Sequence, residues 1–241
     1  MPMKDVEMAR ETFFDDPALD RDSPMVSESF WSALIGHIER DCTLPPRVIL
    51  DVGCHTGGLL LAMSSRFAPI ELVGIEPLAA ARIAASQRLN GATANVRLLD
   101  VSEWGRIPAD TIDLITCHEV LYLESDLCEF MRRLRRVLKY DGVAYVVLGC
   151  HSENPLWKTW KTSLVLAGHS VYDHKPLEIM EAASSAGLLP SVQPLRCSGW
   201  ITYDPRRAEF RYPDVRTMLE HHYRYKLIFR LGVADGTTTA S

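Results

Sequence analysis

Short apolar runs rich in β-branched residues alternate along this chain with longer segments in which apolar residues recur every three or four positions. The first run, residues 48–50, is followed by glycines at 53, 57 and 58 and by an apolar helical segment to about residue 66. Such a run is typical of a buried parallel strand. The alternation predicts further strands at 70–75, 95–99, 112–117, 143–148, 191–203 and 223–231. It predicts further helices at 27–40, 78–90, 126–138, 176–186 and 214–222, with Ser27 and Asp126 as caps.

This alternation of strands and helices predicts an α/β fold, a doubly wound, mostly parallel seven-stranded sheet with helices on both faces. A helix between the last two strands predicts a modified hairpin at one edge of the sheet. We expect a single domain over residues 1–241. Its predicted parts are an N-terminal helical cap (1–43), a ligand-binding core (44–149), a lid insertion after the fifth strand (150–175), the C-terminal part of the sheet (176–233) and a flexible tail (234–241).

Acidic residues stand at the ends of four successive predicted strands. They are Asp51, Glu76, Asp100 and Glu119. In a doubly wound sheet, ligands bind outside the carboxyl ends of the strands. The glycine turn after the first strand lets a ligand lie against bare backbone at a helix N-terminus. The pattern therefore predicts a site for a nucleoside-like ligand.

The first-strand motif, Asp51-Val52-Gly53-Cys54 with Thr56-Gly57, resembles the D-x-G-x-G-x-G signature of class I S-adenosylmethionine-dependent methyltransferases. The likeness continues through the fourth-strand segment 113–123 and the segment 133–142 before the fifth strand. It implies the Rossmann-like methyltransferase fold. His55 replaces the middle glycine of the signature. Histidine is among the residues enriched at positive φ, so we expect the turn to tolerate it.

The resemblance implies S-adenosylmethionine as the cofactor. It places Glu76 on the ribose hydroxyls and Asp100 with Val101 on the adenine. It gives Asp51 one of two roles, facing the amino group of the methionine moiety or stiffening the turn. The cofactor-binding residues that it implies are Asp51, Gly53, Cys54, His55, Thr56, Gly57, Glu76, Pro77, Asp100, Val101 and His118.

Three residues at strand ends are candidates for the proton transfer that a methyl acceptor can require. His118 and Glu119 end the fourth strand, and His151 follows the fifth. Tyr122 is a rival candidate, and amine acceptors that enter neutral need no base. We expect the pair His221-His222 to lie on the surface.

The acceptor is expected to be a small molecule, methylated on O, N or S and plausibly in specialised metabolism. Aromatic residues in the segments outside the core would suit a flat or cationic molecule. Alternatives are a peptide or protein-terminus methyltransferase and a non-catalytic cofactor-binding partner subunit. The aromatic candidates are Phe13, Phe14, Phe30, Trp31, Trp157, Trp160, Trp200, Tyr203, Phe210 and Tyr212.

Composition narrows the partners. The formal net charge is −5, and the arginines at 132–136 sit on an amphipathic helix with acidic neighbours, which disfavours nucleic acid. The six cysteines are scattered without zinc spacing, so we expect reduced thiols and no metal. No apolar run reaches the roughly 18 residues of a membrane span. The N-terminus lacks the apolar core of a signal peptide. These features predict a cytoplasmic protein. We expect a monomer or a homodimer, a choice that the sequence leaves open.

Overall fold

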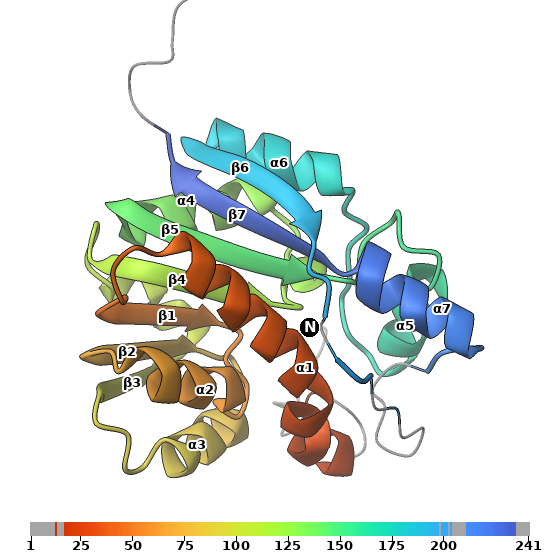
Figure 1. The fold of residues 1–241 in the computed structure, drawn as a ribbon, viewed down its shortest axis with the longest axis horizontal. Helices are drawn as coiled ribbons and strands as arrows, with labels where there is room; N and C mark the ends of the chain where they lie inside the picture. Colours follow the sequence, from red (N-terminus) through yellow and green to blue (C-terminus); the bar gives the residue numbers. More distant parts are fainter. Residues whose placement is uncertain (1–12, 14–16, 198, 202, 204–210, 235–241) are drawn as a thin grey trace, which may run out of the picture.

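The computed structural model describes residues 13, 17–197, 199–201, 203 and 211–234. Its centre is one seven-stranded sheet of order β3-β2-β1-β4-β5-β7-β6, in which β7 alone is antiparallel to β5 and β6 (Figure 1). This confirms the predicted fold class and the hairpin at the edge. The strands are β1 (Val48–Val52), β2 (Glu71–Ile75), β3 (Asn95–Leu99), β4 (Ile112–His118), β5 (Leu138–Leu148), β6 (Leu188–Pro194) and β7 (Leu227–Val233).

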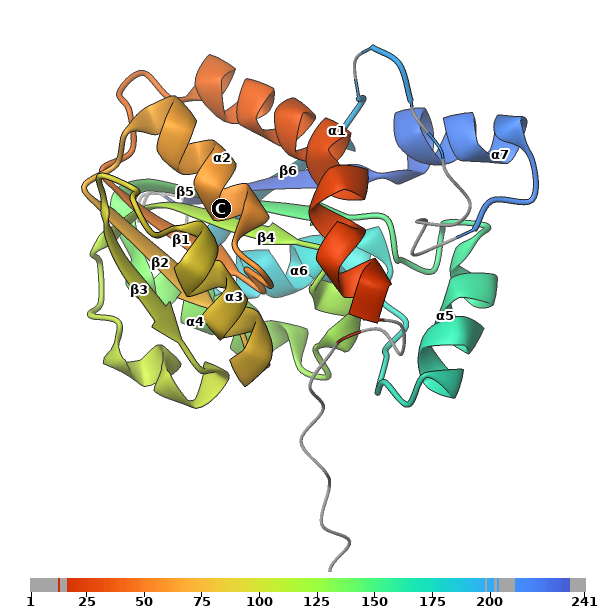
Figure 2. The ribbon, with the colours of Figure 1, turned by 90° about the horizontal axis from the view of Figure 1, so that it is seen from below.

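Helices cover both faces of the sheet, as Figure 2 shows from below. On one face lie α1 (Pro17–Asp41), α2 (Gly58–Phe67) and α3 (Ala79–Arg88), and on the other α4 (Leu127–Val137) and α6 (Pro176–Ser185). The remaining elements are α5 (Trp157–Leu166), α7 (Val215–Glu220), the 3-10 helices η1 (Val101–Arg106) and η2 (Leu121–Leu123), and the π-helical turn η3 (His221–Tyr225).

Two hydrophobic clusters hold these layers together. The first packs Phe130 and Leu134 of α4 and Ile179 of α6 against the sheet. The second packs Leu34 of α1 and Leu60 of α2 against the opposite face. Each helix thus buries the apolar stripe that its spacing predicts, and the sheet becomes a rigid platform with its strand ends fixed.

Several predicted boundaries were wrong at the two ends of the chain. The first helix begins at Pro17, so Ser27 lies inside it and does not cap it. The sixth strand ends at Pro194 instead of extending to 203, because it pairs with β7 only over 188–194. A proline cannot donate to the ladder and is tolerated on an edge strand. The predicted cap Asp126 is confirmed, since its carboxylate accepts the N–H of Glu129 at 2.9 Å. The predicted tail residues 235–241 lie outside the described residues.

The last strand begins at Leu227, four residues later than predicted. The residues before it form η3, which is closed when the N–H of Lys226 donates to the carbonyl of His221 at 2.8 Å. Such π turns are rare in proteins overall, but those that occur are often found at functional sites. The local sequence Tyr-Arg-Tyr alternates like a strand, and only the tertiary setting shows that it is not one.

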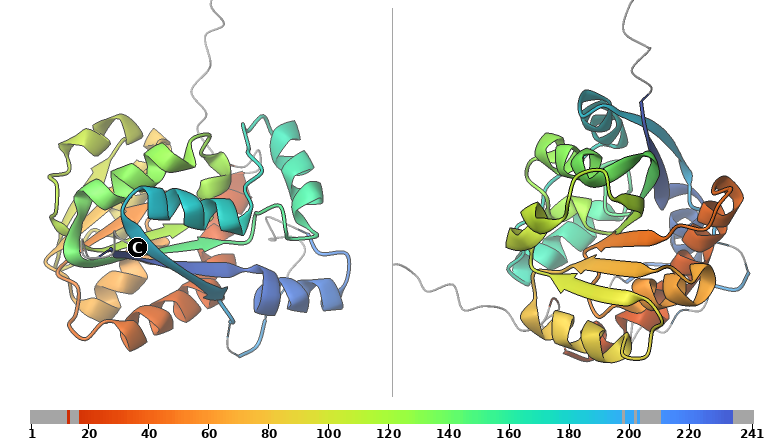
Figure 3. Two further views of the ribbon diagram at one scale, coloured as in Figure 1. Left: turned by 90° about the horizontal axis from the view of Figure 1, so that it is seen from above. Right: turned by 90° about the vertical axis from the view of Figure 1, so that its left-hand side faces the viewer.

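The order of the strands fixes where a ligand can bind. The connections change direction between β1 and β4, the switch point at which open α/β sheets bind ligands. Figure 3 shows α5 and α7 extending beyond the sheet at the carboxyl ends of β4 and β5. Among the described residues, no helix is long and apolar enough to cross a membrane.

Gly74 in β2 provides a test of how tightly this platform is packed. A Cβ at this position would lie 2.6 Å from Cys54 Sγ and 2.8 Å from Leu98 Cδ2. Because both neighbours are held in the core, we expect Gly74→Ala to lower the free energy of unfolding by about 1–3 kcal/mol. The matched control is Gly105→Ala, where a Cβ meets nothing within 4 Å. Urea denaturation of both variants measures the difference, and equal stabilities would contradict the packing argument.

Candidate active site

A cavity of about 480 Å³ opens at the carboxyl ends of β1, β2 and β4. This volume is within the range of small-molecule sites, roughly 300–1,000 Å³. The strand ends form one part of its wall. Residues from α1, η3 and the start of β7 form the other. The cavity therefore joins the predicted cofactor edge of the sheet to segments far away in sequence.

Two buried carboxylates line the cavity at the ends of β1 and β2. Asp51 is 3% exposed and accepts the hydroxyl of Thr116 at 2.7 Å. Burial, opposed by this hydrogen bond and reinforced by the charge of Glu76, raises the pKa of Asp51 to about 7. Burial also raises the pKa of Glu76, whose oxygens accept the N–H groups of His55 at 3.0 Å and Leu78 at 2.9 Å. This end of the cavity is acidic and suits a cation.

The turn after β1 has the backbone shape that its sequence predicts. His55 has φ 46°, in the left-handed region, and its N–H is held by Glu76. Gly53 has φ 75°, and a Cβ there would come within 2.3 Å of Val120 Cγ2. A side chain at 53 is excluded twice, by conformation and by space.

Most of the residues predicted for the site line the cavity. Gly57, Asp100 and His151 do not. The residues that do are Asp51, Gly53, Cys54, His55, Thr56, Glu76, Pro77, Val101, His118 and Glu119. Tyr122 also lines it.

The three others have structural contacts instead. Gly57 has φ 77° at the start of α2 and lies against α3, where a Cβ would meet Ala85 at 3.1 Å. Asp100 caps η1 by accepting the N–H of Ser102 at 2.9 Å and pairs with Arg82 at 3.1 Å. The ring of His151, a predicted candidate base, is buried and is hydrogen-bonded to the carbonyl of Tyr225 at 2.7 Å.

A buried ion pair crosses the other end of the cavity. Lys226 Nζ lies 2.5 Å from Glu119 Oε1, with the two side chains 5% and 17% exposed. Glu119 also accepts the N–H groups of Gly149 at 2.7 Å and Cys150 at 3.3 Å. Burial alone would raise the pKa of Glu119, but Lys226, His118 and these bonds outweigh it and lower the pKa to about 2. Glu119 is therefore a carboxylate that binds strand ends together and a weak proton acceptor.

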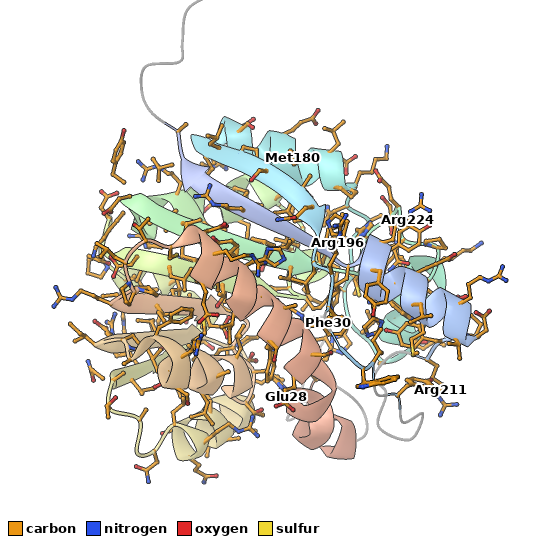
Figure 4. All side chains as sticks on the ribbon, in the orientation of Figure 1. Glu28, Phe30, Met180, Arg196, Arg211 and Arg224 are labelled. Atoms are coloured by element: carbon orange, nitrogen blue, oxygen red, sulfur yellow. The ribbon has the colours of Figure 1, made fainter. Side chains whose placement is uncertain are left out.

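The ion pair is closely surrounded by other groups. Lys226 Nζ lies 4.0 Å from the ring centroid of Phe30, a cation–π contact. Figure 4 labels Phe30 on α1, on the side toward α7 in that view. Gly149 leaves room for the pair, because a Cβ there would lie 3.0 Å from both Glu119 Oε1 and Lys226 Cδ. Glu119 itself has φ 57°, a costly conformation that these bonds maintain.

His118 is an uncharged imidazole at this end. Burial and the cation of Lys226 lower its pKa to about 3, despite the opposing charge of Glu119. Its Nε2 is buried and has no hydrogen-bond partner among the described residues. The residue itself lines the cavity.

The prediction for His221-His222 was wrong. Both side chains are buried, 3% and 5% exposed, and both line the cavity. The π turn and the apolar wall of α1 place them there, which local sequence does not reveal. Lys226 was missed for the same reason, since a lysine at the start of an apolar strand is normally a solvated strand end.

Aromatic side chains wall the same end. His222 stacks on Phe30 with ring centroids 4.8 Å apart, and Trp160 meets His221 edge-on at 4.9 Å. Trp157 does not line the cavity, and Trp200 is 97% exposed. Phe14 and Phe210 lie outside the described residues. The predicted aromatics that line it are Phe13, Phe30, Trp31, Trp160, Tyr203 and Tyr212.

Comparisons with known proteins agree with this geometry. A family described as "Methyltransferase domain" matches residues 49–142. Ubiquinone biosynthesis O-methyltransferases of Pseudomonas paraeruginosa (strain DSM 24068 / PA7) and Hahella chejuensis (strain KCTC 2396) are 29% and 31% identical over 123 and 106 residues. The alignments cover 50% and 42% of this chain and 51% and 43% of those proteins, so the chain spans about half the length of the curated relatives it matches.

A solved structure is similar over nearly the whole chain. It is the complex between the Haloferax volcanii Trm112 methyltransferase activator and the putative methyltransferase, with TM-score 0.73 at 18% identity over 93% of this chain and 98% of that chain. At this identity the likeness concerns the fold. The family match and the two curated relatives support an S-adenosylmethionine-dependent methyltransferase.

The matched segment contains the acidic end of the cavity and part of the other end. Asp51 and Glu76 lie within residues 49–142, as do His118 and Glu119. The π turn and Lys226 follow it. The acidic end thus lies within the family match, whereas the aromatic end is completed by residues outside it.

The raised pKa of Asp51 predicts a pH-dependent stability of the ligand-free methyltransferase. Its folded pKa of about 7 exceeds the unfolded value, so its contribution is present at low pH and is lost as pH rises from about 4 through 7. We expect the free energy of unfolding of Asp51→Asn, relative to that of the wild type, to increase as pH rises over this interval. The slope of this difference should approach about 1.4 kcal/mol per pH unit.

Denaturation at several pH values measures this gain. The contrast is Asp113→Asn. Burial opposes, but Lys139 and the N–H groups of Val48 and Arg47 together lower the pKa of Asp113. The free energy of unfolding of this variant, relative to that of the wild type, should decrease as pH rises. Parallel curves for Asp51→Asn and wild type would refute the assignment.

The Glu119–Lys226 pair predicts strong coupling between two substitutions. Lys226→Met leaves a buried carboxylate unpaired and Glu119→Gln a buried ammonium, and each should cost about 3–5 kcal/mol of unfolding free energy. The double variant should cost clearly less than the sum, since neither charge remains. Equilibrium denaturation of the four proteins completes the cycle. Additive costs would show that the pair carries no buried electrostatic coupling.

Proposed function

We propose that this chain transfers the methyl group of S-adenosylmethionine to a nucleophilic O, N or S atom of a small molecule of specialised metabolism. The observation that carries the proposal is one continuous cavity with two unlike ends. Its acidic end contains the family's cofactor motif, and its aromatic end is of a size and chemistry for an acceptor. The expectation of a cytoplasmic monomer or homodimer belongs to the same proposal.

The residues of the acidic end fit this cofactor. S-adenosylmethionine carries a sulfonium and an ammonium group, both positively charged. Asp51 is a buried carboxyl group whose pKa is raised by burial and by the nearby negative charge of Glu76. An ammonium group would compensate the negative charge of these carboxyl groups. When bound, the cofactor supplies an electrophilic methyl group on a positively charged sulfur.

The residues around the proposed cofactor site, which we call the cofactor cradle, each have a proposed role. Glu76 would accept the ribose hydroxyls with the lone pairs that His55 and Leu78 leave available. Val101 lines the cavity and would contact the adenine, while Asp100 shapes its turn by capping η1. Gly53, with no side chain, allows close approach of the methionine part.

At the acceptor end the protein would mainly align the reacting atoms. Holding the nucleophile in line with the methyl carbon can supply much of the barrier reduction. The rings of Phe30, Trp160 and Tyr212 would position a flat acceptor. His118, neutral and with an unpartnered Nε2, would contact it near the strand end. The names of the two relatives favour oxygen as the methylated atom.

Turnover experiments test this activity directly. The protein is incubated with S-adenosylmethionine and panels of phenols, amines and thiols, and release of S-adenosylhomocysteine is measured. Release with at least one panel supports the proposal. Tight cofactor binding in calorimetry with no release on any panel would instead favour the non-catalytic binding subunit.

Glu76→Ala tests the cofactor cradle. Loss of hydrogen bonds to a charged group should weaken S-adenosylhomocysteine binding by about 1–3 kcal/mol, roughly 5- to 150-fold in Kd by calorimetry. Glu76→Gln, which keeps part of the acceptor capacity, should fall between. The matched control is Glu71→Ala at the other end of β2, where Glu71 pairs with Arg97 at 2.6 Å. An unchanged Kd for Glu76→Ala would remove the ribose role.

A further inference from the structure

The two adjacent histidines of η3 are held by different partners, and these partners decide which ring nitrogen carries the proton. Each neutral imidazole has one N–H and one bare nitrogen. Burial and Lys226 lower the pKa of both His221 and His222, so both rings are neutral near pH 7. Their tautomers can be assigned from the hydrogen-bond network.

His221 is fixed by Asn154. The amide of Asn154 is oriented by two bonds, because its Oδ1 accepts the N–H of Leu156 at 3.1 Å and its Nδ2 donates to the carbonyl of Gly149 at 2.7 Å. The same Nδ2 lies 3.2 Å from Nδ1 of His221. An amide nitrogen can only donate, so Nδ1 is the acceptor. The proton of His221 is therefore on Nε2.

His222 is fixed the opposite way. Its Nδ1 lies 2.8 Å from the carbonyl oxygen of Met218. A carbonyl can only accept, so Nδ1 carries the proton and Nε2 is the bare nitrogen. Two consecutive residues thus bring one N–H donor and one acceptor nitrogen to the wall of the same cavity.

The two rings lie close enough to serve one substrate group. Their centroids are 5.5 Å apart and nearly perpendicular, at 87°. Hydrogen bonds of about 2.8 Å to each ring could be made by a single oxygen between them. Aromatic rings flank the pair: Phe30 stacks on His222, and Trp160 and Tyr212 lie 4.9 and 5.7 Å from His221.

We propose that His221 and His222 together recognise a hydroxyl group on an aromatic acceptor, with His221 Nε2–H donating to the oxygen and His222 Nε2 accepting its proton. Only a group that both accepts and donates satisfies the pair. This inference rests on the proposed methyl transfer and deepens it, since it makes the substrate a phenolic compound and the methylated atom oxygen.

The proton transfer balances. The hydroxyl oxygen forms the bond to the methyl carbon, and the electron pair of the breaking carbon–sulfur bond stays on sulfur. The hydroxyl proton passes to Nε2 of His222, which becomes an imidazolium and returns the proton to water. Nδ1–H on the Met218 carbonyl keeps the ring oriented throughout. Such a positioned base contributes typically 10²- to 10⁴-fold to the rate.

The tautomers can be tested without a substrate. Protein labelled with ¹⁵N-histidine is studied by long-range proton–nitrogen NMR at neutral pH, with His221→Asn and His222→Asn assigning the signals. We expect His221 to be protonated on Nε2 and His222 on Nδ1. Matching tautomers, or either ring doubly protonated, would overturn the proposal.

Binding tests the recognition itself. The probes are phenol and anisole, which share the ring while only phenol can donate, titrated into protein saturated with S-adenosylhomocysteine. The wild type should prefer phenol by about tenfold, the worth of one hydrogen bond. His222→Asn, whose amide can still donate to Met218, should lose the preference. The control His37→Asn, which loses a ring bonded to the Leu195 carbonyl outside the cavity, should keep it.

Equal or undetectable preference in the wild type would overturn the inference. In turnover with catechol, His222→Asn should lower kcat at least 100-fold and leave the Kd of S-adenosylmethionine within twofold. The deficit should shrink with 4-nitrocatechol, which ionises without help; an undiminished deficit would make His222 structural only. Failure of the broader proposal is distinct, because it would appear as absent S-adenosylmethionine binding in the same calorimeter.

Discussion

The buried pair of Glu119 and Lys226 is the constraint on which the acceptor end of this molecule depends. It joins the ends of β4 and β5 to the start of β7, since Glu119 holds both the ammonium of Lys226 and the backbone of Gly149. The strained φ of Glu119 and the missing side chain at 149 are the costs of closing this junction. Burial, reinforced by the cation of Lys226, lowers the pKa of the three neighbouring histidines His118, His221 and His222, so this region sets both the shape and the protonation of the cavity wall.

The two ends of the cavity differ in charge, one acidic and the other neutral, and this difference suits the proposed sulfonium cofactor. Burial raises the pKa values of Asp51 and Glu76 at the ends of β1 and β2, and a bound cation such as the proposed cofactor would favour their charged forms. At the other end the charges are matched in a pair and the remaining polar groups are neutral. A neutral acceptor could therefore bind beside the positively charged sulfur of the proposed cofactor, because the two molecules would not compete for the acidic groups.

Sequence predicted the parts of this arrangement that local rules govern. The parallel strands, the glycine turn, the positive φ of His55 and the acidic strand ends all follow from short-range pattern and from the geometry of a doubly wound sheet. It failed where distant segments decide the outcome. His222 is buried against Phe30, which lies some 190 residues earlier in the chain. Asp100 follows the third strand as predicted, but its carboxylate caps η1 by accepting the N–H of Ser102.

The division between what sequence reveals and what it hides matches a division in the molecule. The parallel part of the sheet carries the cofactor motif and is the part that the family match covers. The antiparallel strand β7 inserts between β5 and the edge strand β6, and the π turn before it places His221, His222 and Lys226 at the cavity. A fold built this way can keep its cofactor chemistry while exchanging the acceptor wall, because the wall enters from a separate, later segment. The acceptor of such a protein has therefore to be inferred from the hydrogen-bond donors and acceptors that line its own acceptor end. In this chain the tautomers assigned to His221 and His222 favour a hydroxyl group.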